Sequence, residues 1–188
     1  HDALPISGSG ILHQEMPKPA DRMLGVQLWV NLPKEDKMTA PRYSDISKDM
    51  IPVVDEEDAV VRIISGDYKD KAKGVDPAFV KATLYDVTVK PGKTVTIDTK
   101  EEDNVFIFLI EGDGLVGDQF ISEKTAVLFG EGSSIQVSAK EREVRFIYFG
   151  GKPLNEPIAW AGPIVMNTKE ELSEAFSELE QGSFIKHD

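Results

Sequence analysis

Short apolar runs separated by turn residues extend from Ala59 to Phe149, and this pattern restricts the fold more than any other feature of the sequence. Turn residues close several of the runs, as at Pro91-Gly92 and in the glycine-rich stretch Gly112–Gly117. Short strands at this spacing are typical of an all-β sandwich or barrel. We expect strands at 60–64, 83–89, 94–97, 105–110, 126–129, 135–137 and 144–149.

Two apolar stretches precede this series. The stretch 26–32 predicts a strand, because its alternation places every second side chain on one face and Pro33 then removes a ladder donor. The stretch 10–16 also predicts a strand. Residues 34–58 are polar, contain Pro41 and Pro52, and predict a linker that crosses between domains.

The end of the chain changes to a helical pattern. Thr168 and Glu171 form a capping box, in which a hydroxyl and a carboxylate satisfy the free amides at a helix start. Gly182 is placed to end the helix, which we expect at about 168–181. The apolar side chains fall on one face, which must pack against another element: Leu172, Ala175, Phe176 and Leu179.

The net charge of −12 at pH 7 argues against direct binding to nucleic acid, which relies on clustered lysine and arginine. The one dense basic group, at Lys69, Lys71 and Lys73, is predicted to be a solvated loop. No apolar run approaches the roughly 20 residues of a membrane helix, and the absence of cysteine excludes disulfides. We therefore expect a cytoplasmic protein with no membrane partner.

The sequence contains three histidines, which are its candidate nitrogen ligands for a metal. Of these, His1 and His187 lie at the ends, and His187 is expected to be solvated. His13 is followed at i+2 by Glu15, so on a strand the two side chains project from the same face and make a suitable ligand pair for a divalent metal. Such a pair also occurs by chance, as a surface pair or with a satisfied core histidine, and two ligands are too few for a mononuclear iron site.

Other chemistry finds less support. A Ser-His-Asp triad would have to use His13, and the sequence has no nucleophile-elbow motif. The stretch Gly112–Gly117 lacks the lysine and following helix of a phosphate loop and predicts a turn. Trp29 and Trp160 are expected to be packing residues rather than ligand-stacking ones.

Several motifs, taken together and in order, resemble the pirin family over residues 8–188. Gly8-Ser-Gly-Ile-Leu-His-Gln-Glu-Met-Pro17 resembles the family's metal-site segment, and Gly25-Val-Gln-Leu-Trp-Val-Asn-Leu-Pro33 resembles the strand that follows it. Lys37-Met-Thr-Ala-Pro-Arg-Tyr43 resembles the start of the interdomain crossing. Two later signature stretches are matched by Leu128-Phe-Gly-Glu-Gly132 and Gly162-Pro-Ile-Val-Met-Asn-Thr168.

The resemblance implies two facing β-domains of the cupin type and a C-terminal helix. It also implies one metal, most often Fe(II), held in the N-terminal domain by three histidines and a glutamate. His13 and Glu15 match the third histidine and the glutamate, whereas the His-x-His segment that carries the other two is absent from this sequence. The C-terminal domain of such proteins usually holds no metal, and 60–149 here contains no histidine.

The expected organisation follows from this resemblance. Residues 1–7 fit no pattern and resemble a translated sequencing adapter, so they are expected to be a non-native leader. Residues 8–51 would be the remnant of the N-terminal domain with the crossing, 52–151 a complete C-terminal cupin domain, and 152–188 a segment with the helix. The apolar side chains of 11–32 would then be exposed, because most of their sheet is missing.

The resemblance leaves two functions open for the parent protein. It implies either a quercetin 2,3-dioxygenase-type enzyme for a flavonol-like aromatic substrate, with Glu15 as a ligand and a candidate base, or a non-catalytic, iron-responsive redox regulator that acts through protein partners. The chain itself is expected to be inactive, because half of its metal site is missing.

Overall fold

The computed structural model describes residues 2–3, 6–14, 16, 19, 21 and 23–187. The chain divides into two compact units. One unit is continuous and spans Ile46–Pro153, whereas the other combines Asp2–Asp45 with Leu154–Asp188.

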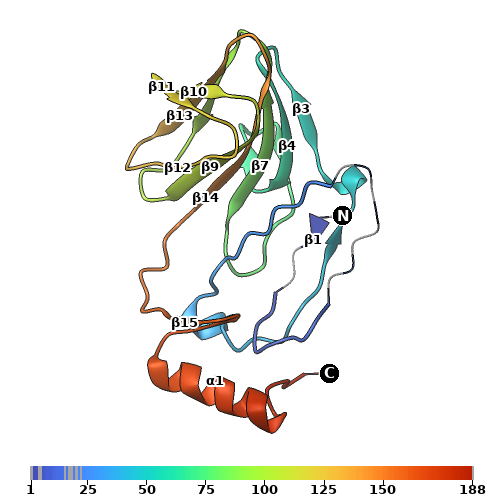
Figure 1. The fold of residues 1–188 in the computed structure, drawn as a ribbon, viewed down its shortest axis with the longest axis vertical. Coiled ribbons are helices and arrows are strands. Elements are labelled where there is room, and N and C mark those ends of the chain that lie inside the picture. The colour runs from blue at the N-terminus through green and yellow to red at the C-terminus, as the bar shows by residue number, and fades with distance from the viewer. Residues whose placement is uncertain are drawn as a thin grey trace. The chain divides into compact units, whose positions relative to one another are not determined.

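The continuous unit is built on a six-stranded antiparallel sheet (Figure 1). The strand order is β12-β9-β14-β7-β4-β3, so that β14 and β7 are central and sequence neighbours are not always sheet neighbours. The strands are β3 (Val53–Asp55), β4 (Ala59–Ser65), β7 (Thr83–Val89), β9 (Asn104–Glu111), β12 (Ala126–Leu128) and β14 (Val144–Gly151).

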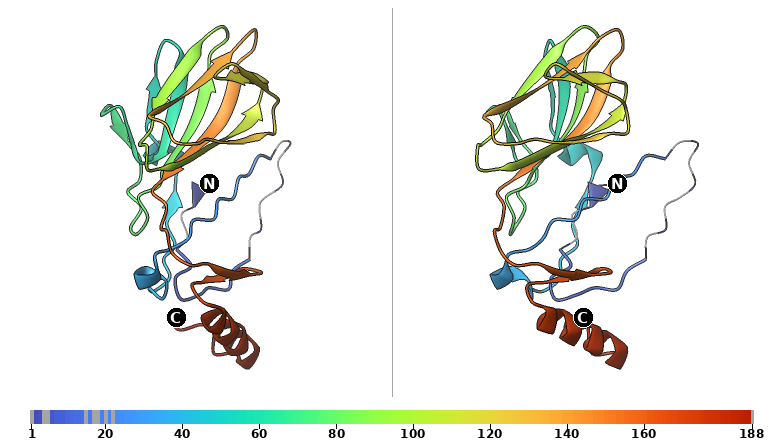
Figure 2. Two further views of the ribbon diagram at one scale, coloured as in Figure 1. Left: turned by 90° about the vertical axis from the view of Figure 1, so that its left-hand side faces the viewer. Right: turned by 60° about the vertical axis from the view of Figure 1, so that its left-hand side comes forward.

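A four-stranded antiparallel sheet faces the first sheet (Figure 2). Its order is β11-β10-β13-β8, and its strands are β8 (Thr94–Asp98), β10 (Gly114–Val116), β11 (Gln119–Ile121) and β13 (Ser134–Ala139). A separate small hairpin consists of β5 (Asp67–Tyr68) and β6 (Ala72–Lys73), and a 3-10 helix, η2, spans Lys48–Met50.

Alternation along the strands explains why the two sheets pack together. In β4 every second residue is buried, and Ala59, Val61 and Ile63 are fully enclosed. Because side chains of a strand point alternately to its two faces, this alternation directs one face of each sheet to a shared core. The strands of both sheets supply that core, including Ile107, Val137 and Phe146.

The six-stranded sheet also has apolar residues on its other face. Ile110, Ile147 and Phe149 are buried there, and the rings of Phe106 and Phe149 stack with centroids 4.3 Å apart. The β14 strand is therefore apolar on both sides, as a central strand should be. The all-β prediction is confirmed, and the architecture is a two-sheet sandwich rather than one closed barrel.

The second unit contains little regular structure apart from a hairpin and a helix. Strands β15 (Ala159–Ala161) and β16 (Ile164–Met166) form the hairpin, and α1 (Lys169–Gln181) packs against both (Figures 1 and 2). The second unit also contains the 3-10 helix η1 (Lys34–Asp36) and β1 (Asp2–Ala3). β1 pairs with β2 (Asp45–Ile46), a strand at the point where the chain passes from one unit to the other.

The helix begins and ends as its sequence predicts. The hydroxyl of Thr168 accepts from the backbone N–H of Glu171 at 3.1 Å, and the Glu171 carboxylate accepts from the backbone N–H of Thr168 at 2.9 Å. Gly182 follows in the left-handed conformation with φ +73°. The predicted C-terminal helix with its capping box is therefore confirmed.

The predicted strand at 26–32 is wrong, and so is the predicted strand at 10–16 as far as that stretch is described. Both are irregular, and within the described part of the chain no backbone–backbone hydrogen bond is made by 26–32. Alternation selects a face, but a strand also needs a neighbour to pair its N–H and C=O groups. The expected exposure of apolar side chains is observed, at Leu12, Met16, Met23, Leu24, Val26, Leu28, Trp29 and Val30.

The tryptophans also differ from expectation, since both are largely exposed. Trp29 is 57% exposed and Trp160 is 68% exposed, so neither is a core packing residue. The indole N–H of Trp160 donates to the carbonyl of Gly162 at 2.8 Å, which fixes the ring over its own hairpin turn.

Candidate functional site

A glycine turn positions the segment that carries His13. Gly8 and Gly10 have φ of +50° and +125°, backbone conformations that residues other than glycine rarely adopt. The backbone N–H of Ser9 donates to the carbonyl of Thr39 at 2.9 Å, and a Cβ on Gly8 would lie 2.1 Å from that same oxygen. The turn, which ends three residues before His13, is thus held tightly against Thr39.

The imidazole of His13 is exposed, while Glu15 lies outside the described residues. Across residues 2–3, 6–14, 16, 19, 21 and 23–187, no group of three or more His, Cys, Asp or Glu side chains is arranged to hold a metal ion. The described residues therefore do not make a metal centre by themselves. His13 and Glu15 match two of the four ligands that the family resemblance implies, and their role as ligands stays a prediction.

The C-terminal tail lies against the other side of this turn. A Cβ on Gly10 would meet the ring of Phe184 at 2.4 Å. Ile11, Leu12 and Pro41 line a hollow of about 300 Å³ together with Ile185 and His187 of the tail. His187 is exposed, as expected.

A buried lysine lies in the same unit. Lys37 is only 6% exposed, and its Nζ donates to Oδ1 of Asn31 at 2.7 Å. Burial lowers the pKa of Lys37, and the carboxylates of Glu156 and Glu171 oppose that shift. The ammonium therefore lies among opposite charges that offset part of its desolvation.

The two carboxylates near Lys37 also connect distant segments. Glu156 accepts from the backbone N–H of Lys34 at 2.9 Å and from the side-chain amide of buried Asn167 at 3.2 Å. Glu171 accepts from the backbone N–H of Thr168 and Asn167, and these bonds lower its pKa. Sequence analysis missed this network, although Lys37, Asn31 and Asn167 all fall within motifs quoted above.

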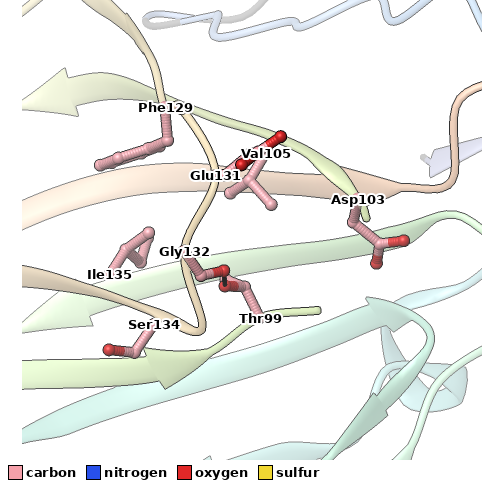
Figure 3. A pocket seen from close by; sticks show the side chains of 9 residues that line it. Thr99, Asp103, Val105, Phe129, Glu131, Gly132, Ser134 and Ile135 are labelled. Carbon is pink, nitrogen blue, oxygen red and sulfur yellow. Dashed lines mark hydrogen bonds between the residues drawn. The ribbon is translucent and has the colours of Figure 1, made fainter. Parts of the chain in front are cut away.

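A small pocket opens at one end of the sandwich, where β9 and β13 begin (Figure 3). Its volume is about 130 Å³, and Val105, Phe129 and Ile135 supply its apolar lining. The carboxyl groups of Asp103 and Glu131 lie at the same pocket, without a histidine. Two carboxylates alone fall short of the three-ligand set that a mononuclear metal site needs.

Three tyrosines occupy the interior of the sandwich. The rings of Tyr85 and Tyr148 stack with centroids 5.3 Å apart, and Tyr68 packs edge-on against Tyr85 at 5.5 Å. Burial raises the pKa of Tyr148 to about 12, with a further contribution from Asp103. Burial also raises the pKa of Tyr85, whose hydroxyl donates to the carbonyl of Asp67. Both shifts favour the uncharged, protonated form of these two phenols, as their burial among apolar side chains requires.

Two lysines of the basic group, Lys69 and Lys71, share one acidic partner. The carboxylate of Glu56 accepts from Lys71 at 2.6 Å, from Lys69 at 2.9 Å and from the hydroxyl of Tyr68 at 3.1 Å. The hydrogen bond from Lys71 is the largest of the effects that lower the pKa of Glu56 to about 2. The three lysines are solvated as expected, since Lys69, Lys71 and Lys73 are all exposed, and Lys73 lies on β6.

Comparison with known proteins places this geometry in a family. Residues 84–185 match the model of the pirin C-terminal cupin domain. A Thermoplasma acidophilum protein provisionally named quercetin 2,3-dioxygenase is 35% identical over 207 residues, covering 96% of this chain and 77% of that protein. Human pirin is 38% identical over 183 residues, covering 92% of this chain and 61% of its own length.

A solved structure supports the same family assignment. The crystal structure of quercetin 2,3-dioxygenase from Acinetobacter baumannii matches with a TM-score of 0.76 and 37% identity, over 83% of this chain and 55% of that one. The chain thus spans only part of the length of these relatives. No helix within the described residues is both long and apolar enough to cross a membrane. On sequence and structure alike, this chain belongs to the pirin family and has its cupin-type β-sandwich fold.

Proposed function

We propose that the chain is part of a metal-dependent dioxygenase of the quercetin 2,3-dioxygenase type, with His13 and Glu15 as two of its metal ligands. The metal is Fe(II), and the substrate is a small flavonol-like aromatic molecule. The observation that carries the proposal is the exposed imidazole of His13, three residues after the glycine turn at Gly8–Gly10 and within the motif that resembles the family's metal segment. The names of the Thermoplasma and Acinetobacter relatives support the activity.

In this proposal each of the two residues has a limited role. His13 supplies one neutral imidazole nitrogen to the metal, and Glu15 supplies one carboxylate oxygen and serves as a base toward a substrate hydroxyl. The bound metal, when its other ligands are present, supplies the chemistry with O₂. The sequence contains no His-x-His segment, so the chain at its given length binds metal weakly and is inactive.

The test compares this chain with a version extended upstream by a pirin-type His-x-His segment. Iron content and quercetin-dependent O₂ uptake are measured for both. We expect about one iron per chain and O₂ uptake only in the extended protein. An extended protein without bound metal would show that the site assignment is wrong.

Single substitutions in the extended protein separate the ligands from a neighbouring polar side chain. His13→Ala and Glu15→Ala are each expected to remove most of the bound iron. Gln14→Ala is the matched control, because Gln14 lies between them in sequence, is also exposed and lies outside the proposed ligand set. Equal iron loss from Gln14→Ala would contradict the assignment of His13.

A second candidate is a redox-responsive regulator that acts through protein partners. The net charge of −12 supports it, because an acidic surface is compatible with protein partners and disfavours bare DNA. This candidate predicts stoichiometric iron without quercetin-dependent O₂ uptake, together with a partner whose affinity changes between Fe(II) and Fe(III). Uptake that requires both iron and quercetin would favour the enzyme instead.

A further inference from the structure

We infer that the C-terminal tail, Ser183–His187, is a positioning element for the segment that carries His13. The consequence for metal binding rests on the proposed function, whereas the contact between Phe184 and Gly10 does not. Nothing in the sequence pattern links these residues, which lie at opposite ends of the chain.

The contact is tight because glycine leaves no space for a side chain. A Cβ on Gly10 would lie 2.4 Å from Cε1 and 2.7 Å from Cζ of Phe184, so the edge of the ring touches the backbone of Gly10. The φ of +125° at Gly10 independently requires glycine. The ring therefore contacts the turn at Gly10, the residue whose φ sets the direction of the chain toward His13.

The tail is itself anchored on the helix. The backbone N–H of Ser183 donates to the carbonyl of Glu178 at 2.9 Å. Lys186 pairs with the Glu178 carboxylate and donates to the carbonyl of Ser183 at 3.2 Å. Phe184 lies between these anchor points, so its backbone is tied to the last turn of α1.

The turn is thus fixed from two sides. On one side Ser9 and Gly8 lie against the carbonyl of Thr39, and on the other Phe184 covers Gly10. Without the ring, only the Thr39 side remains, and the direction of the chain at Ile11 and Leu12 is no longer determined. Those two residues already border a hollow of about 300 Å³, so space is available for the segment to move.

The first experiment measures amide hydrogen exchange by NMR in the full chain. The N–H groups of Ser9 and Gly10 are both hydrogen-bonded, to Thr39 and Ser7 respectively, so their exchange reports opening of the turn. Phe184→Ala is expected to speed exchange of both amides about tenfold. Phe120→Ala is the matched control, since Phe120 is 62% exposed on β11 in the other unit. Unchanged exchange in Phe184→Ala overturns the inference.

A double-substitution cycle tests whether the contact is direct. Gly10→Ala is expected to speed exchange at Ser9, because its Cβ collides with the ring and its φ is unsuitable for alanine. Combining it with Phe184→Ala should give less than the product of the two single effects, since the collision is absent. Gly8→Ala collides with Thr39 instead, so its effect should multiply with that of Phe184→Ala. Multiplicative behaviour for both glycines would overturn direct coupling.

The consequence for metal is read in the extended protein by titration with Co²⁺. Groups that orient a ligand typically change metal affinity by ~10–100-fold, and Phe184→Ala is expected to raise the Kd for Co²⁺ about tenfold while Phe120→Ala leaves it unchanged. If the unsubstituted extended protein binds no Co²⁺, the proposed function fails and the exchange data alone decide the role of the tail. If it binds and Phe184→Ala has no effect, the tail does not position His13.

Discussion

The Nζ atom of Lys37 lies 2.7 Å from Oδ1 of Asn31, in a site where the lysine is only 6% exposed. The bond closes the short loop from Asn31 to Lys37 and brings an ammonium group near Glu156 and Glu171. A buried charge is tolerated only when it is paired and hydrogen-bonded. Lys37 therefore connects the N-terminal part of this unit to the hairpin and helix that follow Leu154.

Lys37→Met should weaken the second unit. The substitution keeps the aliphatic stem but removes the ammonium, which leaves Asn31, Glu156 and Glu171 without their cation, at an expected cost of about 2 kcal/mol. Both tryptophans, Trp29 and Trp160, belong to this unit, so urea unfolding followed by tryptophan fluorescence reports on it directly. Lys34→Met is the control because the Lys34 side chain is exposed and its hydrogen bond to Glu156 uses the backbone. Equal effects of the two substitutions would contradict the role of Lys37.

Glu56→Gln should remove a pH-dependent part of the stability of the sandwich. The native pKa of Glu56 is about 2 against an ordinary value of 4.5, so the folded state binds its proton less readily than the unfolded state. The stabilisation is fully present above pH 4.5 and is lost as the pH falls toward 2. After allowance for partial exposure, about 1 kcal/mol is expected at pH 7.

The measurement for Glu56 is chemical unfolding by circular dichroism between pH 7 and pH 2. The stability difference between the native sequence and Glu56→Gln should shrink across that range. Glu57→Gln is the control, since Glu57 is 84% exposed in its pair with Lys93 and should contribute little. A difference that stays constant down to pH 2 would show that the Lys69 and Lys71 pairs do not act through the Glu56 charge.

Ile107→Ala should destabilise the sandwich strongly. Ile107 has no exposed surface and lies on β9, at the centre of the core shared by the two sheets. Truncating an enclosed isoleucine removes its transfer free energy and leaves a cavity, which costs ~2–5 kcal/mol. Leu128→Ala on neighbouring β12 is the control, because Leu128 is 77% exposed. Circular dichroism during urea unfolding measures both, and a loss below about 1 kcal/mol for Ile107→Ala would contradict this account of the core.

Thr168→Ala should shorten the helix from its first turn. The substitution removes the hydroxyl that accepts from Glu171 N–H, and loss of such a cap costs about 1 kcal/mol. Ser173→Ala, in the exposed middle of the same helix, provides the comparison. The expected signal is a lower urea midpoint by tryptophan fluorescence for Thr168→Ala alone. Equal midpoints in both variants would argue against the cap.

The sequence predicted correctly those elements that depend on residues close to one another in the chain. The alternation in Ala59–Ser65 is visible in the sequence because each side chain needs only a face, and the helix start is visible because Thr168 and Glu171 are three residues apart. The same alternation at 26–32 gave a wrong strand, since it carries no information on whether a pairing neighbour exists.

The candidate site was only partly predictable. His13 could be selected from its spacing to Glu15, and its role as a ligand remains a prediction, as does the division of the chain at residues 51 and 151. Lys37 resembles any surface lysine in sequence, because its partner Glu156 lies 119 positions later. Gly10 and Phe184, which are in contact, are separated by even more of the sequence, and no periodicity or motif connects them.

The exposed apolar side chains between Leu12 and Val30 have a further consequence for the behaviour of the protein in solution. Each copy carries a net charge of −12, so two copies that approach through these side chains repel each other. The range of that repulsion is set by the electrolyte, from a Debye length of ~10 Å at 0.1 M salt to ~3 Å at 1 M. Dilute buffer therefore keeps the copies apart, and concentrated salt promotes their self-association.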